Sequence, residues 1–180
     1  MAEARNVENQ PRLRVRAALA DEWRANVETG VPVLDHLLSL LAEYGGFELG
    51  LEVEPGGSAA AEVAPAGRAL GEAVAGALHA PDARQLGSAA VPADEALAHV
   101  ALEASGRPLV VSNVDLSDAR VAGLRSDLVG DFLREFAEGA GLTLHVRLIE
   151  GSDPQHVLEA IFKALGVALA QACRPRSRKE

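Results

Sequence analysis

The chain of 180 residues has a single cysteine, Cys173, and only 3% aromatic residues. One cysteine excludes a disulfide framework and a cysteine-based zinc site within one chain, which indicates a reducing, cytoplasmic environment. Because bulky aromatic side chains are scarce, the core must be built from Ala, Leu and Val. Such small side chains favour helices that pack closely.

We expect neither a targeting segment nor a membrane segment. The N-terminus, MAEARNVENQPR, has no apolar run of the kind a signal peptide needs, and no stretch resembles the roughly 18 apolar residues of a membrane span. The 26 acidic and 17 basic residues leave a net charge of −9, which disfavours nucleic acid and anionic membranes as partners. We interpret the one basic cluster, RPRSRKE, as a solvated tail, with residues 175–180 outside the fold.

What the sequence does contain is an internal repeat. HLLSLLAEYGGFELGLEVEPGG at 36–57 aligns without a gap to DFLREFAEGAGLTLHVRLIEGS at 131–152, 95 positions later. Self-similarity of this kind indicates that one structural plan is used twice. We therefore expect two homologous halves, at 5–79 and 97–174, joined by a linker at 80–96.

Each half shows the same series of periodicities. Alternating or β-branched segments predict strands, and apolar residues three and four apart predict amphipathic helices. Strands are expected at 13–20, 47–53, 96–104, 109–116 and 142–148, and helices at 34–45, 62–78, 126–139 and 154–172. The predicted fold class is α/β (α+β), with one small mixed sheet and two helices from each half and the helices packed between the sheets.

Histidines and a glutamate in the later half suggest metal chemistry. His156 and Glu159 are three apart on an expected helix, so both side chains project from one face, and imidazole with carboxylate suits a divalent transition metal. A surface His–Glu pair is the alternative interpretation. His145 alternates with apolar neighbours on its strand, and His36 follows Asp35 at the start of an apolar helix. Each of these histidines, taken singly, also fits a hydrogen-bonded structural role.

Five motifs fall in order along the chain: TGVPVLDHLL, VPADEAL, ALEASGRP, LTLHV and HVLEAIFKAL. Together they resemble the imidazoleglycerol-phosphate dehydratase family of histidine biosynthesis, and the resemblance covers nearly the whole chain. It implies a duplicated α/β fold and a large shell-like homo-oligomer with sites formed between subunits. It also implies two manganese ions, held by a His-His-x-x-Glu motif in each half and by the histidines of the LDH and TLH motifs.

When the family's metal-ligand motifs are placed on this sequence position by position, several of the ligands are missing. The matching residues, which form the candidate metal set, are His36, His145, His156 and Glu159. Gln155 stands in place of the first histidine of the second motif. In the first half, Ala60 and Ala61 replace the paired histidines and Ala64 replaces the glutamate. The internal repeat marks the same three positions independently.

The resemblance also implies substrate contacts. Arg107 and Lys163 match basic residues that bind the substrate phosphate in the family, a role suited to guanidinium and ammonium groups. Asp94 and Glu95 persist, either as weak candidates for a catalytic role or as an acidic pair that caps a turn or helix. Three family features are altered. The family's arginine in an R-[FY]-G motif before DEAL is replaced by Leu86-Gly87-Ser88, and Arg84 is nearby but out of register. The family's Glu-Thr pair near the N-terminus maps to Asn9-Gln10, and its PS-x-KG tail is missing.

Three hypotheses account for this pattern. The leading one is a dehydratase-like paralogue that has lost the di-manganese dehydration, because the substitutions fall on ligand positions. The second is an active lyase whose metal site is rebuilt from other donors, for which the nearest candidates are Glu62, His79 and Asp82. The third is a binding or regulatory subunit that holds a phosphorylated small molecule through Arg107 and Lys163. The expected cofactor is manganese or none, and the expected assembly is a homo-oligomer.

Overall fold

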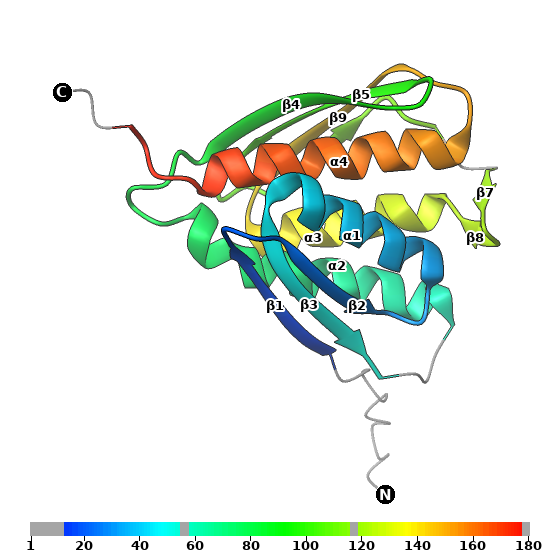
Figure 1. The fold of residues 1–180 in the computed structure, drawn as a ribbon, viewed down its shortest axis with the longest axis horizontal. Coiled ribbons are helices and arrows are strands. Elements are labelled where there is room, and N and C mark those ends of the chain that lie inside the picture. Colours follow the sequence, from blue (N-terminus) through cyan, green and yellow to red (C-terminus); the bar gives the residue numbers. More distant parts are fainter. Residues whose placement is uncertain (1–12, 55–57, 116–118, 178–180) are drawn as a thin grey trace, which may run out of the picture.

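The computed structural model describes residues 13–54, 58–115 and 119–177, which form two main β-sheets with helices between them (Figure 1). The first half consists of β1 (Leu13–Leu19), β2 (Arg24–Glu28), α1 (Pro32–Gly45), β3 (Phe47–Val53) and α2 (Ala59–Leu78). β3 is the central strand of the first sheet, antiparallel to β1 and parallel to β2. Its sequence FELGLEV alternates, so every second side chain, beginning with Phe47, is buried.

The second half repeats this arrangement and adds to it. Its elements are β4 (Leu86–Ala93), β5 (Ala96–Glu103), β6 (Leu109–Ser112), β7 (Arg120–Val121), β8 (Leu124–Arg125), α3 (Asp127–Ala140), β9 (Thr143–Glu150) and α4 (Pro154–Cys173). The second sheet has the order β4-β5-β9-β6. β9 is antiparallel to β5 and parallel to β6, as β3 is to β1 and β2. β4 extends this sheet by pairing with the other edge of β5.

The two halves share one plan with a fixed offset. α1 and α3 each have 14 residues, α2 and α4 each have 20, and both bounds of each pair differ by 95. Gly46 and Gly141 end α1 and α3 in the same left-handed conformation, with φ of 68° and 66°. Glycine is favoured there because it has no Cβ to clash. The repeat seen in the sequence is therefore a repeat of structure.

Helices of the two halves pack on each other between the sheets. α2 packs on α3 and α4 packs on α1, so the last helix of each half contacts the first helix of the other. Glycine permits both approaches: a Cβ on Gly71 would collide with the carbonyl oxygen of Phe136, and one on Gly166 with that of Leu41. Since Gly71 and Gly166 are equivalent in the repeat, the two crossings use one geometry.

Aliphatic side chains make up most of the buried core, as the scarcity of aromatic residues predicts. The largest buried side chains in the layer between α3 and α4 are three phenylalanines. The rings of Phe132 and Phe136 lie parallel, with centroids 6.4 Å apart, and Phe162 of α4 is 5.8 Å from Phe132. The α/β class with helices between two mixed sheets is confirmed.

Several expected bounds require correction. Residues 80–96, expected to be a linker, contain β4, whose small side chains and Pro92 give a weak strand signal that an edge position tolerates. β2 is a further strand that the short, charged sequence RANVE did not indicate. The strand expected at 109–116 ends at Ser112, because the Asn113 side chain takes over the hydrogen bonds to the backbone N–H and C=O of Leu148.

Helix α2 begins three residues earlier than expected and continues through Pro65. A proline at this place removes one backbone hydrogen bond, but Val63, Ala66 and Leu70 on the same helix are buried and hold it in the core. Helix packing thus outweighs the local preference.

The two ends of the sequence need separate comment. The expected solvated tail begins inside the fold, because Pro175 bridges to Ala83 and the Arg176 guanidinium donates a hydrogen bond of 2.9 Å to the Ala83 carbonyl oxygen. Asn9 and Gln10 lie outside the described residues, as do residues 178–180. Contrary to the sequence expectation, α4 is long and apolar enough to cross a membrane by length and composition, but 72% of its apolar window is buried in this fold.

Candidate functional site

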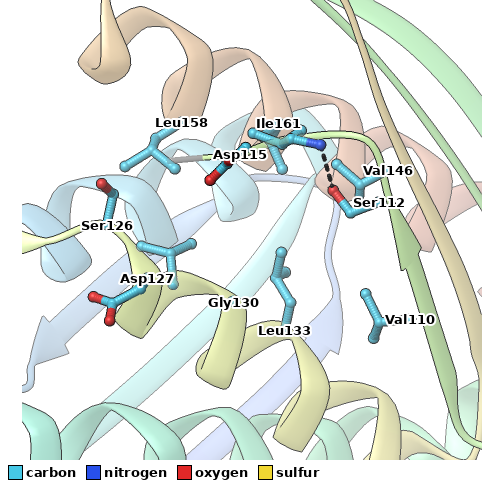
Figure 2. Close-up of a pocket in the computed structure, with 12 residues that line it drawn as sticks. Val110, Ser112, Asp115, Ser126, Asp127, Gly130, Leu133, Val146, Leu158 and Ile161 are labelled. Carbon is cyan, nitrogen blue, oxygen red and sulfur yellow. Dashed lines mark hydrogen bonds between the residues drawn. The ribbon is translucent and has the colours of Figure 1, made fainter. Parts of the chain in front are cut away.

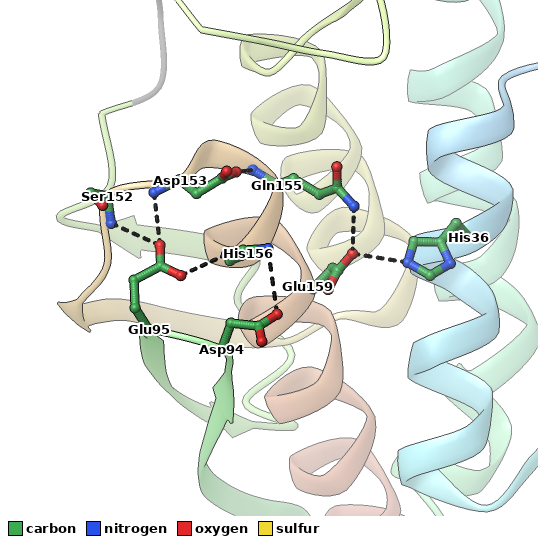
Figure 3. Close-up of polar contacts among 8 residues, drawn as sticks. All are labelled: His36, Asp94, Glu95, Ser152, Asp153, Gln155, His156 and Glu159. Atoms are coloured by element: carbon green, nitrogen blue, oxygen red, sulfur yellow. Dashed lines mark hydrogen bonds and ion pairs between the residues drawn. The ribbon is translucent and has the colours of Figure 1, made fainter.

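Candidate residues of the second half gather around the N-terminus of α4 (Figure 3). The Asp153 carboxylate caps this helix by accepting a hydrogen bond of 2.8 Å from the Gln155 N–H, and Pro154 occupies the first turn. The β4–β5 turn packs against the cap. Glu95 Oε1 accepts hydrogen bonds from the backbone N–H groups of Asp153, at 2.9 Å, and Ser152, at 3.4 Å.

His156 lies between the two acidic residues of this turn. Its Nδ1 is 2.6 Å from Glu95 Oε2, and its Nε2 is 3.4 Å from Asp94 Oδ2. Asp94 has a φ of 47°, in the left-handed region that a tight turn requires. Both ring nitrogens of His156 therefore have a carboxylate partner. Glu95 also accepts hydrogen bonds from the backbone N–H groups just before α4, which is the capping role predicted as one alternative for it.

These contacts shift the pKa values of both groups. The pKa of Glu95 is lowered to about 2, first by the hydrogen bond from the Asp153 backbone N–H and then by that from His156. The hydrogen bond to Glu95 raises the pKa of His156, against a smaller opposing effect of burial. The cluster therefore favours the imidazolium form. In this arrangement both ring nitrogens of His156 are engaged by carboxylates.

Glu159 belongs to a second cluster, between α4 and α1 (Figure 3). Its Oε1 is 3.0 Å from His36 Nε2 and accepts a hydrogen bond of 3.0 Å from the Gln155 side-chain amide. Burial alone would raise the pKa of Glu159, but the hydrogen bonds from Gln155 and His36, helped by nearby positive charge, leave it lowered. His156 and Glu159 thus have different partners rather than forming one pair.

Two other candidates lie away from these clusters. His145 is exposed on the outer face of β9, as its alternation with buried neighbours predicts, so the sheet separates it from the helix layer. Arg107 is exposed in the turn that follows β5, whereas Asp94 and Glu95 precede β5. The eight residues of β5 separate the two ends by about 25 Å. His36, His156 and Glu159 therefore lie in two clusters beside the first turns of α4, and His145 and Arg107 belong to neither.

Lys163 lies one helical turn beyond Glu159, with its ammonium 5.1 Å from the centre of the Tyr44 ring in α1. A cation above an aromatic face is attracted by the ring quadrupole. The sequence carries no signal for this contact, because it depends on how α1 and α4 cross. The same is true of Gln155, which in sequence is only a missing histidine and in the structure is a hydrogen-bond donor to Glu159.

The two remaining histidines have structural contacts. A ring nitrogen of His79 lies 2.8 Å from the carbonyl oxygen of Ala140 at the end of α3. His99 is 2.7 Å from the Ser88 hydroxyl, across the β4–β5 pair. Neither contact joins the clusters around α4.

Known proteins match both the sequence and this fold. A family model described as imidazoleglycerol-phosphate dehydratase matches residues 29–169. The chain belongs to the imidazoleglycerol-phosphate dehydratase family. A protein of that name from Syntrophobacter fumaroxidans is 45% identical over 161 residues, covering 88% of this chain and 82% of the relative. One from Acetivibrio thermocellus is 40% identical over 160 residues, covering 87% and 82%.

A solved structure gives the same result. The crystal structure of imidazoleglycerol-phosphate dehydratase from Staphylococcus aureus has a TM-score of 0.83 and 30% identity, and covers 92% of this chain and 95% of that one. The family resemblance inferred from the five motifs is therefore confirmed, and with it the place of this protein among the proteins of histidine biosynthesis.

The donor set does not fit the two manganese ions that the dehydratase resemblance implies. Ala60, Ala61 and Ala64 lie in the first two turns of α2, at the positions where α4 carries its candidate ligands. Methyl groups cannot coordinate a metal, so these positions add no donor to any site, whether within one chain or shared between copies. Within residues 13–54, 58–115 and 119–177, no group of three or more His, Cys, Asp or Glu side chains is placed to hold a metal ion.

Proposed function

We propose that this chain is a member of the dehydratase family that lacks the two-manganese dehydration reaction. The observation that carries the proposal is alanine at positions 60, 61 and 64. Helix α2 corresponds to α4 with an offset of 95 residues, so these alanines stand where α4 has Gln155, His156 and Glu159. Glu62, the acidic residue in the same turn, cannot take over, because its side chain is buried while Ala61 is exposed, so the two leave different sides of α2.

The surviving donors support the same proposal. His156 is held by two carboxylates that favour its protonated form. Glu159 accepts hydrogen bonds from Gln155 and His36. A metal ion would have to compete with these hydrogen bonds for the donor atoms of His156 and Glu159. The former ligand residues of α4 act here as polar contacts between α4, α1 and the β4–β5 turn.

A second candidate function, an active dehydratase, is favoured by the 45% identity to the Syntrophobacter protein. It would require a metal site rebuilt from other donors. Glu62 is buried in the first turn of α2, and His79 follows the last residue of that helix. Seventeen residues of helix separate them by roughly 25 Å. His79 is also engaged with Ala140, so these two side chains do not converge on one ion.

The proposal includes what a non-catalytic member would bind. Arg107 is exposed, and the Lys163 ammonium lies over the Tyr44 ring. Both cations are therefore suited to bind the phosphate of a small molecule, as a binding or regulatory subunit would require. We expect the protein to form a homo-oligomer in the cytoplasm, where the lone buried Cys173 stays reduced.

Direct turnover tests the proposal. Purified protein is given imidazoleglycerol phosphate with excess manganese, and loss of water from the substrate is followed. No product above a protein-free blank is expected, from a sample whose fold and assembly are verified by circular dichroism and light scattering. An active relative assayed alongside is the positive control.

A variant that carries the family's donor residues provides a matched comparison. The substitutions Ala60→His, Ala61→His, Ala64→Glu and Gln155→His together restore the donors of the family pattern. This variant is expected to bind manganese where the wild-type chain does not, as measured by metal analysis after dialysis. Turnover by the wild-type chain that a chelator abolishes would overturn the proposal and favour the rebuilt site.

A further inference from the structure

The two sheets have hollows of different chemistry. The one beneath the second sheet, of about 230 Å³ between β6, α3 and α4, has mostly aliphatic walls (Figure 2). A larger hollow of about 570 Å³ lies on the outer face of the first sheet, which is the face turned away from the helices. This volume is within the range of small-molecule sites, roughly 300–1,000 Å³. Its lining is polar and includes Arg16 of β1, Trp23, Arg24 and Asn26 at β2, and Glu48 and Gly50 of β3.

Glycine at position 50 explains why the outer face of the first sheet is hollow. Gly50 lies between Arg16 and Asn26 in the register of the three strands, so it occupies the middle of the face. A Cβ placed on it would meet no atom within 4 Å. The equivalent position of the second half, 95 residues later, is His145, whose side chain stands on the outer face of β9. A ligand can therefore lie against bare backbone in the first half, where no side chain stands in its way.

The charges around this glycine do not cancel. The Arg16 guanidinium forms an ion pair with Glu48. Arg24 is opposite the same glutamate in the register, and within residues 13–54, 58–115 and 119–177 it has no ion-pair partner of its own. The lining thus has one uncompensated positive charge, in a chain whose net charge is −9. The next row of the face, outside the lining, is net negative because it holds two glutamates and one arginine: Glu28, Glu52 and Arg14. An anion is therefore favoured at Arg24 rather than farther along the sheet.

Trp23 adds an aromatic surface beside this charge. It is the only tryptophan of the chain, it directly precedes Arg24, and it is 47% exposed. An exposed indole can stack on a flat ring, and a guanidinium can bind a carboxylate through two parallel hydrogen bonds. The Asn26 amide, two residues along β2 from Arg24, can both donate and accept hydrogen bonds. Groups for stacking and for charge recognition thus meet at one end of the hollow.

We propose that this hollow binds a small aromatic carboxylate. The ring stacks on the Trp23 indole above the bare backbone of Gly50, and the carboxylate pairs with the Arg24 guanidinium. A cation of the same shape is rejected, because it would meet the uncompensated positive charge of the lining. None of the lining residues belongs to the clusters around α4. The proposal therefore stands whether or not the protein has dehydratase activity.

Four matched probes test the proposal. The purified full chain is titrated with benzoate, with the neutral benzamide, with the cationic benzylamine and with cyclohexanecarboxylate, an anion without an aromatic ring. Because Trp23 is the only tryptophan, its fluorescence reports on this hollow alone, and calorimetry gives the affinities. Benzoate is expected to quench the emission saturably.

The order of the affinities separates charge from stacking. Benzoate is expected to bind about fivefold more tightly than benzamide, the upper range for a charge pair open to solvent. It is expected to bind about threefold to tenfold more tightly than cyclohexanecarboxylate, which cannot stack on the indole. Benzylamine is expected to give no saturable response.

Variants locate the site. Arg24→Gln should reduce the affinity for benzoate to that for benzamide. Arg14→Gln is the matched control, because it makes the same change of charge on the next row of the face and should bind benzoate as the wild type does. Trp23→Leu, followed by calorimetry, should bind benzoate no better than cyclohexanecarboxylate. Gly50→Leu should fill the hollow and abolish binding while the protein stays folded, since a Cβ at that position meets no atom within 4 Å.

Three results would overturn the proposal. Equal affinities for benzoate and benzamide would show that Arg24 does not select the ligand. An equal loss of affinity in Arg24→Gln and Arg14→Gln would show a general attraction to surface charge. No saturable response to benzoate, with Trp23 emission protected from acrylamide, would show that a second copy of the chain covers this face in the assembled protein; the same lack of response with an accessible Trp23 would show an open face without a ligand. None of these results bears on the turnover assay, so the two proposals fail separately.

Discussion

Gly166 of α4 lies directly against the backbone carbonyl of Leu41 in α1, so closely that a methyl group at this place would collide with it. The two helices can approach only because position 166 carries no side chain. Gly166→Ala is therefore expected to lower the free energy of unfolding by about 1–3 kcal/mol, the usual cost of overpacking a tight core. Urea denaturation followed by circular dichroism measures the change.

A matched glycine provides the control. Gly76 is in α2, and a Cβ on it would meet nothing within 4 Å. Gly76→Ala is expected to raise stability by up to about 1 kcal/mol, because alanine has the higher helix propensity. If both substitutions had the same effect, the approach of α4 to α1 would not be the reason for glycine at 166.

The contact between Glu95 and His156 predicts a pH-dependent stability. The pKa of Glu95 falls from 4.5 to about 2 in the fold, so its contribution is present above about pH 4.5 and is lost as the pH falls toward 2. The pKa of His156 is raised above 6.5, so its contribution is complete below that pH and is lost as the pH rises through the raised value.

Glu95→Gln tests this linkage. The difference in unfolding free energy between wild type and variant should be widest between about pH 4.5 and 6.5 and should narrow on both sides. Chemical denaturation at pH 3, 5.5 and 9 measures it. On the alkaline side the difference should persist in part, because Glu95 also accepts backbone hydrogen bonds from Asp153 and Ser152. A difference that stayed constant from pH 3 to pH 9 would contradict the assignment.

His36 and Glu159 are expected to be coupled, but weakly. The His36 side chain is 50% exposed and that of Glu159 14%, so solvent screens their attraction. A double-mutant cycle with His36→Ala and Glu159→Gln should give a coupling energy of about 0.2–1 kcal/mol. His36→Ala combined with Glu95→Gln, which share no contact, should be additive. A coupling energy of zero for the first pair would mean that the contact has no energetic role.

Cys173 is expected to be unreactive in the folded chain. Burial raises the pKa of its thiol to about 11. At pH 8 roughly one thiol in a thousand would be ionised, and the thiolate is the reactive form. A coloured disulfide reagent should therefore react slowly with native protein and quickly in denaturant. Reaction of the native protein at the rate of free cysteine would show that the end of α4 opens readily.

The sequence predicted the helices better than the strands. α1 and α3 bury one stripe each, and their periodicity predicted their extents to within two residues. β4 escaped prediction because its side chains are small and it lies at a sheet edge, where alternation is weak. An edge strand is specified by its partner more than by its own residues.

The sequence named three residues that lie beside the first turns of α4, but it did not indicate their arrangement. Each of His36, His156 and Glu159 stands out in sequence by type and spacing. Their division into two clusters depends on Glu95 and Gln155, whose roles arise from contacts between distant segments. A hydrogen bond across such a separation leaves no periodic signal in the chain.

The sequence by itself determined the family, the repeat with its offset of 95 and the alanines at positions 60, 61 and 64, because residue type and spacing are properties of the covalent chain. Only the tertiary structure decided the partners of His36, His156 and Glu159 and the close approach of α4 to α1. The physical reason is that both depend on how helices and sheets pack, and packing brings together side chains that no local pattern relates.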